Sequence, residues 1–241
     1  MITVEQVKER LARVYDKIQE AGGDPEKITI VAVTKGFDLD AVKAALEAGI
    51  SDIGENYAQE LIYKAESLTD SLTSNESIKP RWHYLGAVQR RKVRRLAPWV
   101  SLWQAVASLD EGKEIARWQP GASVLIEVNV AAEPTKKGCT VEELPTLTRG
   151  LRSMDLEVAG LMTVAPPGEL ALARQVFHRL AQAARELELE CLSMGMSDDY
   201  DAAVAEGATM IRVGRVLFGE RPPKKGSITS TDVRGDNAVG S

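Results

Sequence analysis

The sequence predicts a single α/β domain, a (β/α)8 barrel of the TIM type with an extra helix before the first strand. Three observations support this fold class. Segments rich in β-branched residues alternate with amphipathic helical segments, and eight such pairs follow one another along the chain. Each pair takes about 20 to 35 residues, as parallel strands joined by crossover helices require. The chain has 241 residues and is 44% hydrophobic, which suits one barrel.

The strands are expected to be buried on both faces, because helices cover parallel strands in such folds and the strands read as continuous apolar runs. By this criterion we expect strands over residues 28–35, 52–56, 82–86, 102–106, 123–130, 158–164, 191–196 and 209–214. The fifth strand brings Asn129 close to its end. No GxGxxG fingerprint follows the first strand, which argues against an open dinucleotide-binding sheet.

Helical spacing of apolar residues predicts the other elements. Thr3 is the expected N-cap of the first helix, and Gly22 and Gly23 are its expected end. Polar stretches at residues 69–80 and 131–140 indicate surface loops. We expect the helices near residues 4–18, 39–46, 58–68, 90–95, 110–118, 141–151, 172–187 and 200–206.

Charge and composition argue against several classes of protein. A net charge of -5 and a pI near 5.3 disfavour a general binder of nucleic acid or of membrane surfaces. No segment reaches the roughly 20 apolar residues that cross a bilayer, and the first residues enter an amphipathic helix directly. Cys139 and Cys191 lie far apart without metal-ligand neighbours, so we expect two reduced cysteines in a cytoplasmic protein.

The barrel domain is expected to span residues 1–225. Residues 226–241 lack a periodic apolar pattern and are expected to form a disordered tail or an expression remnant. His83 and His178 are the only histidines in the sequence, and neither paired cysteines nor a close carboxylate cluster accompanies them at ligand spacing. We therefore expect no metal site.

The strand over residues 28–35 ends in Lys35, and Gly36 and a helical pattern follow it. Lys35 therefore belongs at the carboxyl end of a strand, where α/β barrels place their active sites. Partial desolvation there lowers the pKa of an ammonium and leaves a neutral amine that attacks carbonyl compounds. A Schiff-base lysine is one interpretation. The other is a lysine that merely extends from a strand end into water.

The loops after the seventh and eighth strands carry a second candidate feature, because barrels often bind a phosphate there. These loops contain Ser197 and, after Arg212, Gly214 and Arg215, so a hydroxyl and backbone N–H groups are available to an anion. A capping serine and a turn glycine are the structural alternatives. A lysine near such a site suits a phosphorylated aldehyde, either a sugar phosphate in a Schiff-base aldolase or pyridoxal 5'-phosphate.

Six ordered motifs favour the second ligand: AVTK, DIGENYAQE, WHYLGAVQ, GLMTVAP, LSMGMSDDY and IRVGRVLFGER. Together they resemble the pyridoxal-phosphate homeostasis protein family, whose barrel is similar to the amino-terminal domain of alanine racemase, a fold-type III pyridoxal-phosphate protein. The resemblance covers residues 4–221. The chain departs from the family at residues 88–92, where relatives usually read LQxNK and this chain reads VQRRK. Any role of the asparagine in the family motif therefore does not carry over to this chain.

The resemblance implies roles for four residues that hold the cofactor. Lys35 would form the internal aldimine with pyridoxal 5'-phosphate, so the cofactor would be covalently bound. Ser197, in the SMGMS motif, would bind the cofactor phosphate. Gly214 and Arg215 would add backbone N–H donors to the same phosphate.

Four further residues are implied near the cofactor ring. Arg212 would face the pyridine nitrogen, and because its guanidinium stays protonated it disfavours a protonated ring and restrains carbanion chemistry. Asn56 would line the pocket near the ring, with His83 and Met194 as neighbours. For Arg212 the structural alternative is a salt bridge at the barrel rim with an acid such as Glu55.

The function implied by the resemblance is vitamin B6 homeostasis, in which the protein holds pyridoxal phosphate and passes it to apo-enzymes without catalytic turnover of its own. Racemisation would need a second base opposite Lys35. Alanine racemases obtain that base from a partner subunit, supported by an additional C-terminal β domain, and this chain stops soon after the eighth strand. Two alternatives stay open: a racemase-like enzyme of unknown substrate, and a regulatory scaffold that binds a protein through the basic run at residues 90–95. We expect a monomer, with a weak dimer as the alternative.

Overall fold

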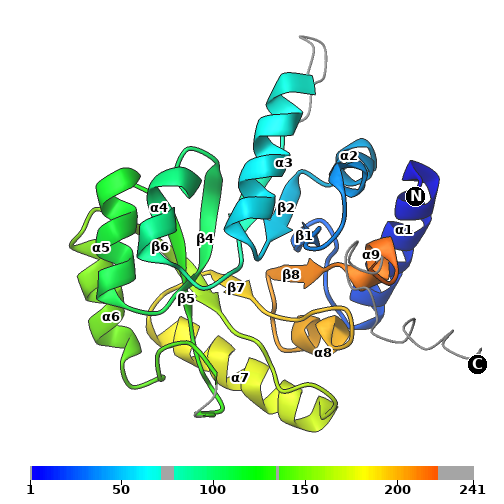
Figure 1. Cartoon of the computed structure of the whole chain (residues 1–241). Helices are drawn as coiled ribbons and strands as arrows, with labels where there is room; N and C mark the ends of the chain where they lie inside the picture. The colour runs from blue at the N-terminus through cyan, green and yellow to red at the C-terminus, as the bar shows by residue number, and fades with distance from the viewer. Residues whose placement is uncertain (1, 72–78, 134–135, 222–241) are drawn as a thin grey trace, which may run out of the picture.

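The computed structural model describes residues 2–71, 79–133 and 136–221. Eight parallel strands follow one another around a closed barrel, and the eighth strand pairs with the first (Figure 1). This arrangement confirms the predicted (β/α)8 barrel. The strands are β1 (Thr29–Val33), β2 (Asp52–Glu55), β3 (Arg81–Tyr84), β4 (Val100–Val106), β5 (Ser123–Glu127), β6 (Glu157–Met162), β7 (Cys191–Ser193) and β8 (Met210–Val213).

Helices surround the barrel, and each strand is followed by a helix (Figure 1). The sequence predicts all of them except the last, whose four residues are too few to show an amphipathic repeat. The helices are α1 (Val4–Glu20), α2 (Leu39–Glu47), α3 (Ala58–Ser71), α4 (Arg90–Leu96), α5 (Leu109–Trp118), α6 (Leu144–Arg152), α7 (Leu170–Glu186), α8 (Tyr200–Ala205) and α9 (Arg215–Phe218).

The first helix, α1, is the predicted addition to the barrel. Thr3 is its N-cap: the Thr3 hydroxyl accepts from the Gln6 N–H, and the Gln6 side chain accepts from the Thr3 N–H. This reciprocal pair is a capping box. The buried face of α1 packs on α2, α8 and α9, which flank β1 and β8, through Val7, Leu11, Val14 and Ile18.

The strand β5 is shorter than the sequence predicts. It ends at Glu127 instead of near residue 130, because the chain beyond it leaves the barrel and pairs with its own returning loop. The Asn129 N–H donates to the Cys139 carbonyl at 2.9 Å, and the Cys139 N–H donates to the Glu127 carbonyl at 2.9 Å. Glu127 therefore occupies the strand end that the sequence assigns to Asn129.

Side chains fill the inside of the barrel, as expected for eight strands. An apolar cluster of Val31, Ala105, Leu125, Met162 and Met210 occupies part of this space and is separate from the larger hydrophobic layer between strands and helices. Buried polar side chains are present as well, namely His83, Gln104, Ser193 and Arg212. Space for a ligand is therefore to be found at the end of the barrel and not along its axis.

Some predictions lie outside the described residues, including most of the loop expected at residues 69–80 and the tail at residues 226–241. The first residues of that expected loop, 69–71, belong instead to the last turn of α3. In the part of the chain that the structure covers, no helix is both long and apolar enough to cross a membrane. Cys139 and Cys191 are both free thiols, as predicted.

Candidate functional site

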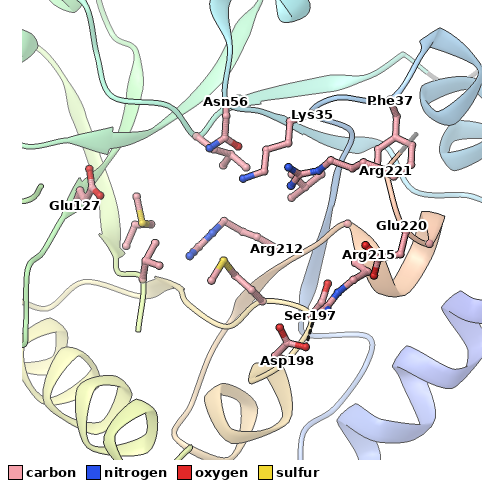
Figure 2. Close-up of a pocket in the computed structure, with 17 residues that line it drawn as sticks. Lys35, Phe37, Asn56, Glu127, Ser197, Asp198, Arg212, Arg215, Glu220 and Arg221 are labelled. Carbon is pink, nitrogen blue, oxygen red and sulfur yellow. Dashed lines mark hydrogen bonds and ion pairs between the residues drawn. The ribbon is translucent and has the colours of Figure 1, made fainter. Parts of the chain in front are cut away.

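A cavity of about 670 Å³ opens at the carboxyl ends of the strands. Its wall consists of residues at or just after the ends of seven strands, β4 being the exception, together with the segment after α9 (Figure 2). This volume lies within the range of small-molecule sites. Six of the eight predicted site residues line the cavity: Lys35, Asn56, Ser197, Arg212, Gly214 and Arg215.

Lys35 extends into the cavity beside Arg212 (Figure 2). Its pKa is lowered from the ordinary value, first by burial and then by the positive charges of Arg221 and Arg212, while Glu55 opposes the shift. The direction confirms the prediction from desolvation. The effect of the two arginines is additional to that prediction, and it favours a neutral, nucleophilic amine.

Thr34 fixes the backbone on one side of Lys35. The buried Thr34 hydroxyl donates to Glu55 Oε1 at 2.7 Å, and the Thr34 N–H donates to the Gly54 carbonyl at 3.0 Å. The Thr34 carbonyl accepts from Lys64 Nζ at 2.8 Å. Hydrogen bonds from one residue therefore join the end of β1 to both β2 and α3.

Gly36 fixes the backbone on the other side of Lys35. Its φ of 75° lies in the left-handed region that favours glycine. The Gly36 N–H donates to Glu60 Oε2 on α3 at 2.7 Å, and the Phe37 N–H closes the turn by donating to the Thr34 carbonyl at 3.0 Å. Lys35 thus projects from a tight turn that is anchored to α3 through both of its neighbours.

Lys64 is a second lysine near this turn, but its surroundings do not suit a reactive amine. Its side chain is 3% exposed, bonds to Glu55 Oε1 at 2.5 Å and does not line the cavity. Burial raises the pKa of the Glu55 carboxyl, and Lys64 and Thr34 oppose that shift. Because Glu55 is paired with Lys64, the described structure does not form the Glu55 to Arg212 salt bridge that was the structural alternative for Arg212.

Ser197 and Arg215 lie together at one end of the cavity (Figure 2), and Gly214, which precedes Arg215, also lines it. Ser197 Oγ accepts from the Val216 N–H in α9 at 3.4 Å. A Cβ atom on Gly214 would lie 2.8 Å from a carbonyl oxygen of β1, so this position requires glycine. The Arg215 guanidinium pairs with Asp198. A hydroxyl and a guanidinium beside a helix start form an environment that suits an anion.

Arg212 is a buried part of the cavity wall. Its Nη1 donates to Ser193 Oγ at 2.7 Å, and its Nη2 donates to the Thr163 carbonyl at 2.8 Å. Burial lowers its pKa to about 10, opposed by Asp199 and Glu127, so the guanidinium is still protonated at neutral pH. Two of its five N–H groups donate within the described residues, and the others are available to a ligand.

His83 and Met194 are not among the residues that line the cavity, so the structure does not place these two predicted neighbours in its wall. His83 lies deeper in the barrel by one pleat of β3, whereas Met194 follows β7 and packs in the hydrophobic layer between strands and helices. Leu85, two residues after His83, and Met196, two residues after Met194, do line the cavity. Side chains two positions apart point to the same face of a strand, so His83 is on the face that leads to the cavity but one step below it.

Several wall residues are absent from the sequence prediction, among them Phe37, Glu127 and Arg221. Burial raises the pKa of Glu127, against the opposing charge of Arg212. Glu127 becomes part of the site because β5 ends early. Arg221 follows the short helix α9, which leaves no pattern in the sequence. For Glu127 the available signal was the single acid in the otherwise apolar run SVLIEVNV.

The basic run at residues 90–95 lies on α4, as predicted, and none of its residues lines the cavity. Arg90 pairs with Asp110 at 3.3 Å, and the Arg94 guanidinium lies 5.0 Å from the centroid of the Trp118 ring. Arg90 and Arg94 therefore each have a partner within the protein itself. A role of this helix in binding a protein partner stays a prediction.

The fold and the site define the class of protein, a barrel of the alanine racemase type. The family model described as alanine racemase, N-terminal domain, matches residues 6–222. This match covers nearly all of the described barrel and agrees with the eight-stranded topology.

The particular family follows from the curated relatives. The pyridoxal phosphate homeostasis protein of Pseudomonas aeruginosa is 36% identical over 225 residues, covering 90% of this chain and 95% of the relative. That of Deinococcus radiodurans is 38% identical over 216 residues, covering 86% and 97%. The chain belongs to the pyridoxal phosphate homeostasis protein family, as its motifs predict. These relatives are named as homeostasis proteins and not as enzymes.

A solved structure agrees with this assignment. PipY of Synechococcus elongatus PCC7942, in the structure described as having PLP bound, superposes with a TM-score of 0.76 at 31% identity, covering 88% of this chain and all of the other.

Proposed function

We propose that this protein binds pyridoxal 5'-phosphate in the cavity at the carboxyl ends of its strands and holds it for intracellular vitamin B6 homeostasis. One observation carries the proposal: a lysine with a lowered pKa shares a cavity with a cluster of groups suited to an anion. An amine that attacks aldehydes and a site for a phosphate are the two features that this ligand needs. The cofactor named for the PipY structure supports the same ligand.

The residues of the cavity fit this cofactor. Lys35 would supply the amine for covalent linkage to the aldehyde, and Ser197, Gly214 and Arg215 would bind the phosphate. Asn56 Oδ1 is buried without a hydrogen-bond partner among the described residues. Because buried polar atoms are normally satisfied, a donor on the ligand, such as a ring hydroxyl, would complete the Asn56 site.

Arg212 is proposed to donate a hydrogen bond to the ring nitrogen of the cofactor. Bound pyridoxal phosphate withdraws electrons from an attached amino acid, and it does so best when the ring nitrogen is protonated. A guanidinium can only donate, so Arg212 favours the unprotonated ring. Arg212 would therefore restrain carbanion formation on an amino acid joined to the cofactor.

We propose that the bound cofactor is passed on to pyridoxal-phosphate-dependent apo-enzymes. Lys35 is only partly buried, so amines from solution can reach the linkage and displace the lysine. The name of the relatives, homeostasis protein, supports such a role. A monomer in the cytoplasm is part of this proposal, and the two free thiols are consistent with a reducing compartment.

The proposal is tested by adding pyridoxal phosphate to the purified protein and recording its absorbance. We expect a saturable band for the wild-type protein and its loss in Lys35→Ala, with wild-type behaviour in the control Lys43→Ala, which removes an exposed lysine of α2. The loaded protein should then restore activity to an apo-enzyme that needs this cofactor. An unchanged band in Lys35→Ala would contradict the site, and failure to restore activity would contradict the delivery role.

A further inference from the structure

A chain of hydrogen bonds crosses the inside of the barrel from the cavity toward its opposite end. Arg212 Nη1 lies 2.7 Å from Ser193 Oγ, and Ser193 Oγ lies 2.7 Å from Gln104 Oε1. Gln104 Nε2 lies 2.7 Å from His83 Nδ1, and His83 Nε2 lies 2.9 Å from Asp52 Oδ1. All five residues are buried. The chain links four different strands to β8, which carries Arg212.

Asp52 ends this chain at the amino end of the barrel. It is the first residue of β2, and it also accepts from Arg81, the first residue of β3, at 2.9 Å. Burial alone would raise the pKa of Asp52, but hydrogen bonds from His83 and Arg81 outweigh burial and lower it to about 2. Asp52 is therefore a carboxylate at neutral pH.

The two charged ends fix the direction of the outer hydrogen bonds, because a guanidinium can only donate and a carboxylate can only accept. Ser193 accepts from Arg212, and its hydroxyl donates to the Gln104 oxygen. The Gln104 amide nitrogen then faces His83, which has to accept at Nδ1 and donate from Nε2. Gln104 Nε2 also donates to Met210 Sδ at 3.1 Å, which agrees with this orientation of the amide.

We propose that Ser193, Gln104 and His83 are positioning residues that hold the Arg212 guanidinium in the direction needed by the cofactor ring, with His83 as the neutral tautomer protonated on Nε2. This inference rests on the proposed binding of pyridoxal phosphate. Buried polar groups are costly unless each is satisfied, and in this arrangement every member of the chain has a hydrogen-bond partner. Arg212 is a long, flexible side chain, so a fixed acceptor at Nη1 restricts the orientations that it can adopt.

The tautomer of His83 can be measured without any cofactor, by nitrogen NMR of protein labelled at histidine. The sequence has two histidines, so His178→Gln assigns both signals. At pH 8 we expect His83 as a single tautomer with the proton on Nε2. In Gln104→Met the donor to Nδ1 is lost, but Asp52 still accepts from Nε2, so we expect the proton to stay on Nε2. A proton on Nδ1 in the wild-type protein, or a mixture of the two tautomers in it, would overturn the proposed direction of the chain.

The positioning role is measured by the affinity for pyridoxal phosphate. Ser193→Ala removes the acceptor of Arg212 Nη1 and should weaken binding about fivefold, the usual effect of one lost hydrogen bond. Gln104→Met removes the acceptor of the Ser193 hydroxyl and should also weaken the binding of pyridoxal phosphate. The matched control is Thr148→Val, because the Thr148 hydroxyl is buried on α6 without a partner among the described residues and lies outside the cavity wall.

The outcomes separate this inference from the proposed function. If the wild-type protein does not bind pyridoxal phosphate, the proposed function fails, whatever NMR shows for His83. If the wild-type protein binds and both Ser193→Ala and Gln104→Met bind within twofold of it, the positioning role is overturned. Weaker binding in both variants, with Thr148→Val unchanged, supports it.

Discussion

The buried pair of Lys64 and Glu55 gives the most direct test of how the Lys35 turn is held. Lys64→Met keeps the length and most of the volume of the side chain but removes its charge. The two side chains of the pair are 3% and 0% exposed, so Glu55 would be left as a buried carboxylate without its counter-charge. The Thr34 carbonyl would also lose the hydrogen bond that it accepts from Lys64.

The expected loss of stability follows from these contacts. Removing one member of a buried ion pair typically costs about 3 to 5 kcal/mol. The second Glu55 oxygen, Oε2, already has no partner among the described residues, so only the Thr34 hydroxyl would still donate to this carboxylate. The double variant Glu55→Gln/Lys64→Met removes the buried charge while keeping an acceptor for the Thr34 hydroxyl. It should regain about 2 kcal/mol or more relative to Lys64→Met.

The measurement is unfolding by urea, with free energies obtained by linear extrapolation. The matched control is Glu9→Gln, which breaks a pair with Arg13 whose side chains are 65% and 70% exposed. Such a pair contributes less than about 0.5 kcal/mol. A loss below about 1 kcal/mol for Lys64→Met would contradict this expectation. So would a double variant whose loss of unfolding free energy is as large as the losses of the two single variants added together.

Three further predictions concern the site and its pH dependence. Gly214→Ala places a Cβ 2.8 Å from the Val33 carbonyl, so we expect a loss of about 1 to 3 kcal/mol in urea unfolding together with weaker cofactor binding; stability equal to wild type would contradict it. The pKa of Asp52 is lowered from 3.8 to about 2, so the native state binds fewer protons than the unfolded state between these values. Stability should then fall by about 1 to 2 kcal/mol as the pH drops from 4 to 2, and acid titration of Asp52→Asn should lack this decrease. Loaded protein incubated with alanine in heavy water should show no exchange of the α-hydrogen, and exchange that depends on Lys35 would instead favour the racemase-like alternative.

The barrel could be predicted because its local signals are strong. Most strands are short apolar runs, and Lys35 ends the first run on the side that faces the cavity. Gly214 follows the eighth strand directly, and Ser197 lies in the loop after the seventh. For these positions, sequence distance from a strand end is a good guide to location, because all strands of a parallel barrel end at the same face.

The rest of the site depends on contacts between residues far apart in the sequence. Lys64 and Glu60 occupy the ordinary helical pattern of α3, and their sequence gives no sign that they hold the turn around Lys35 from a different element. Arg221 lies beyond a helix too short to predict. The depth of His83 follows from the register of β3 on β2, in which His83 lies opposite Gly54, and strand periodicity does not reveal that register.

The central claim is that the amine of Lys35 is the group that binds the aldehyde of the cofactor. Reduction of the protein with borohydride in the presence of pyridoxal phosphate, followed by peptide mass mapping, tests this claim most directly. The account predicts one reduced pyridoxyl adduct per chain, located on Lys35 and absent from Lys35→Ala. No adduct, or an adduct of equal yield on Lys64, would contradict it.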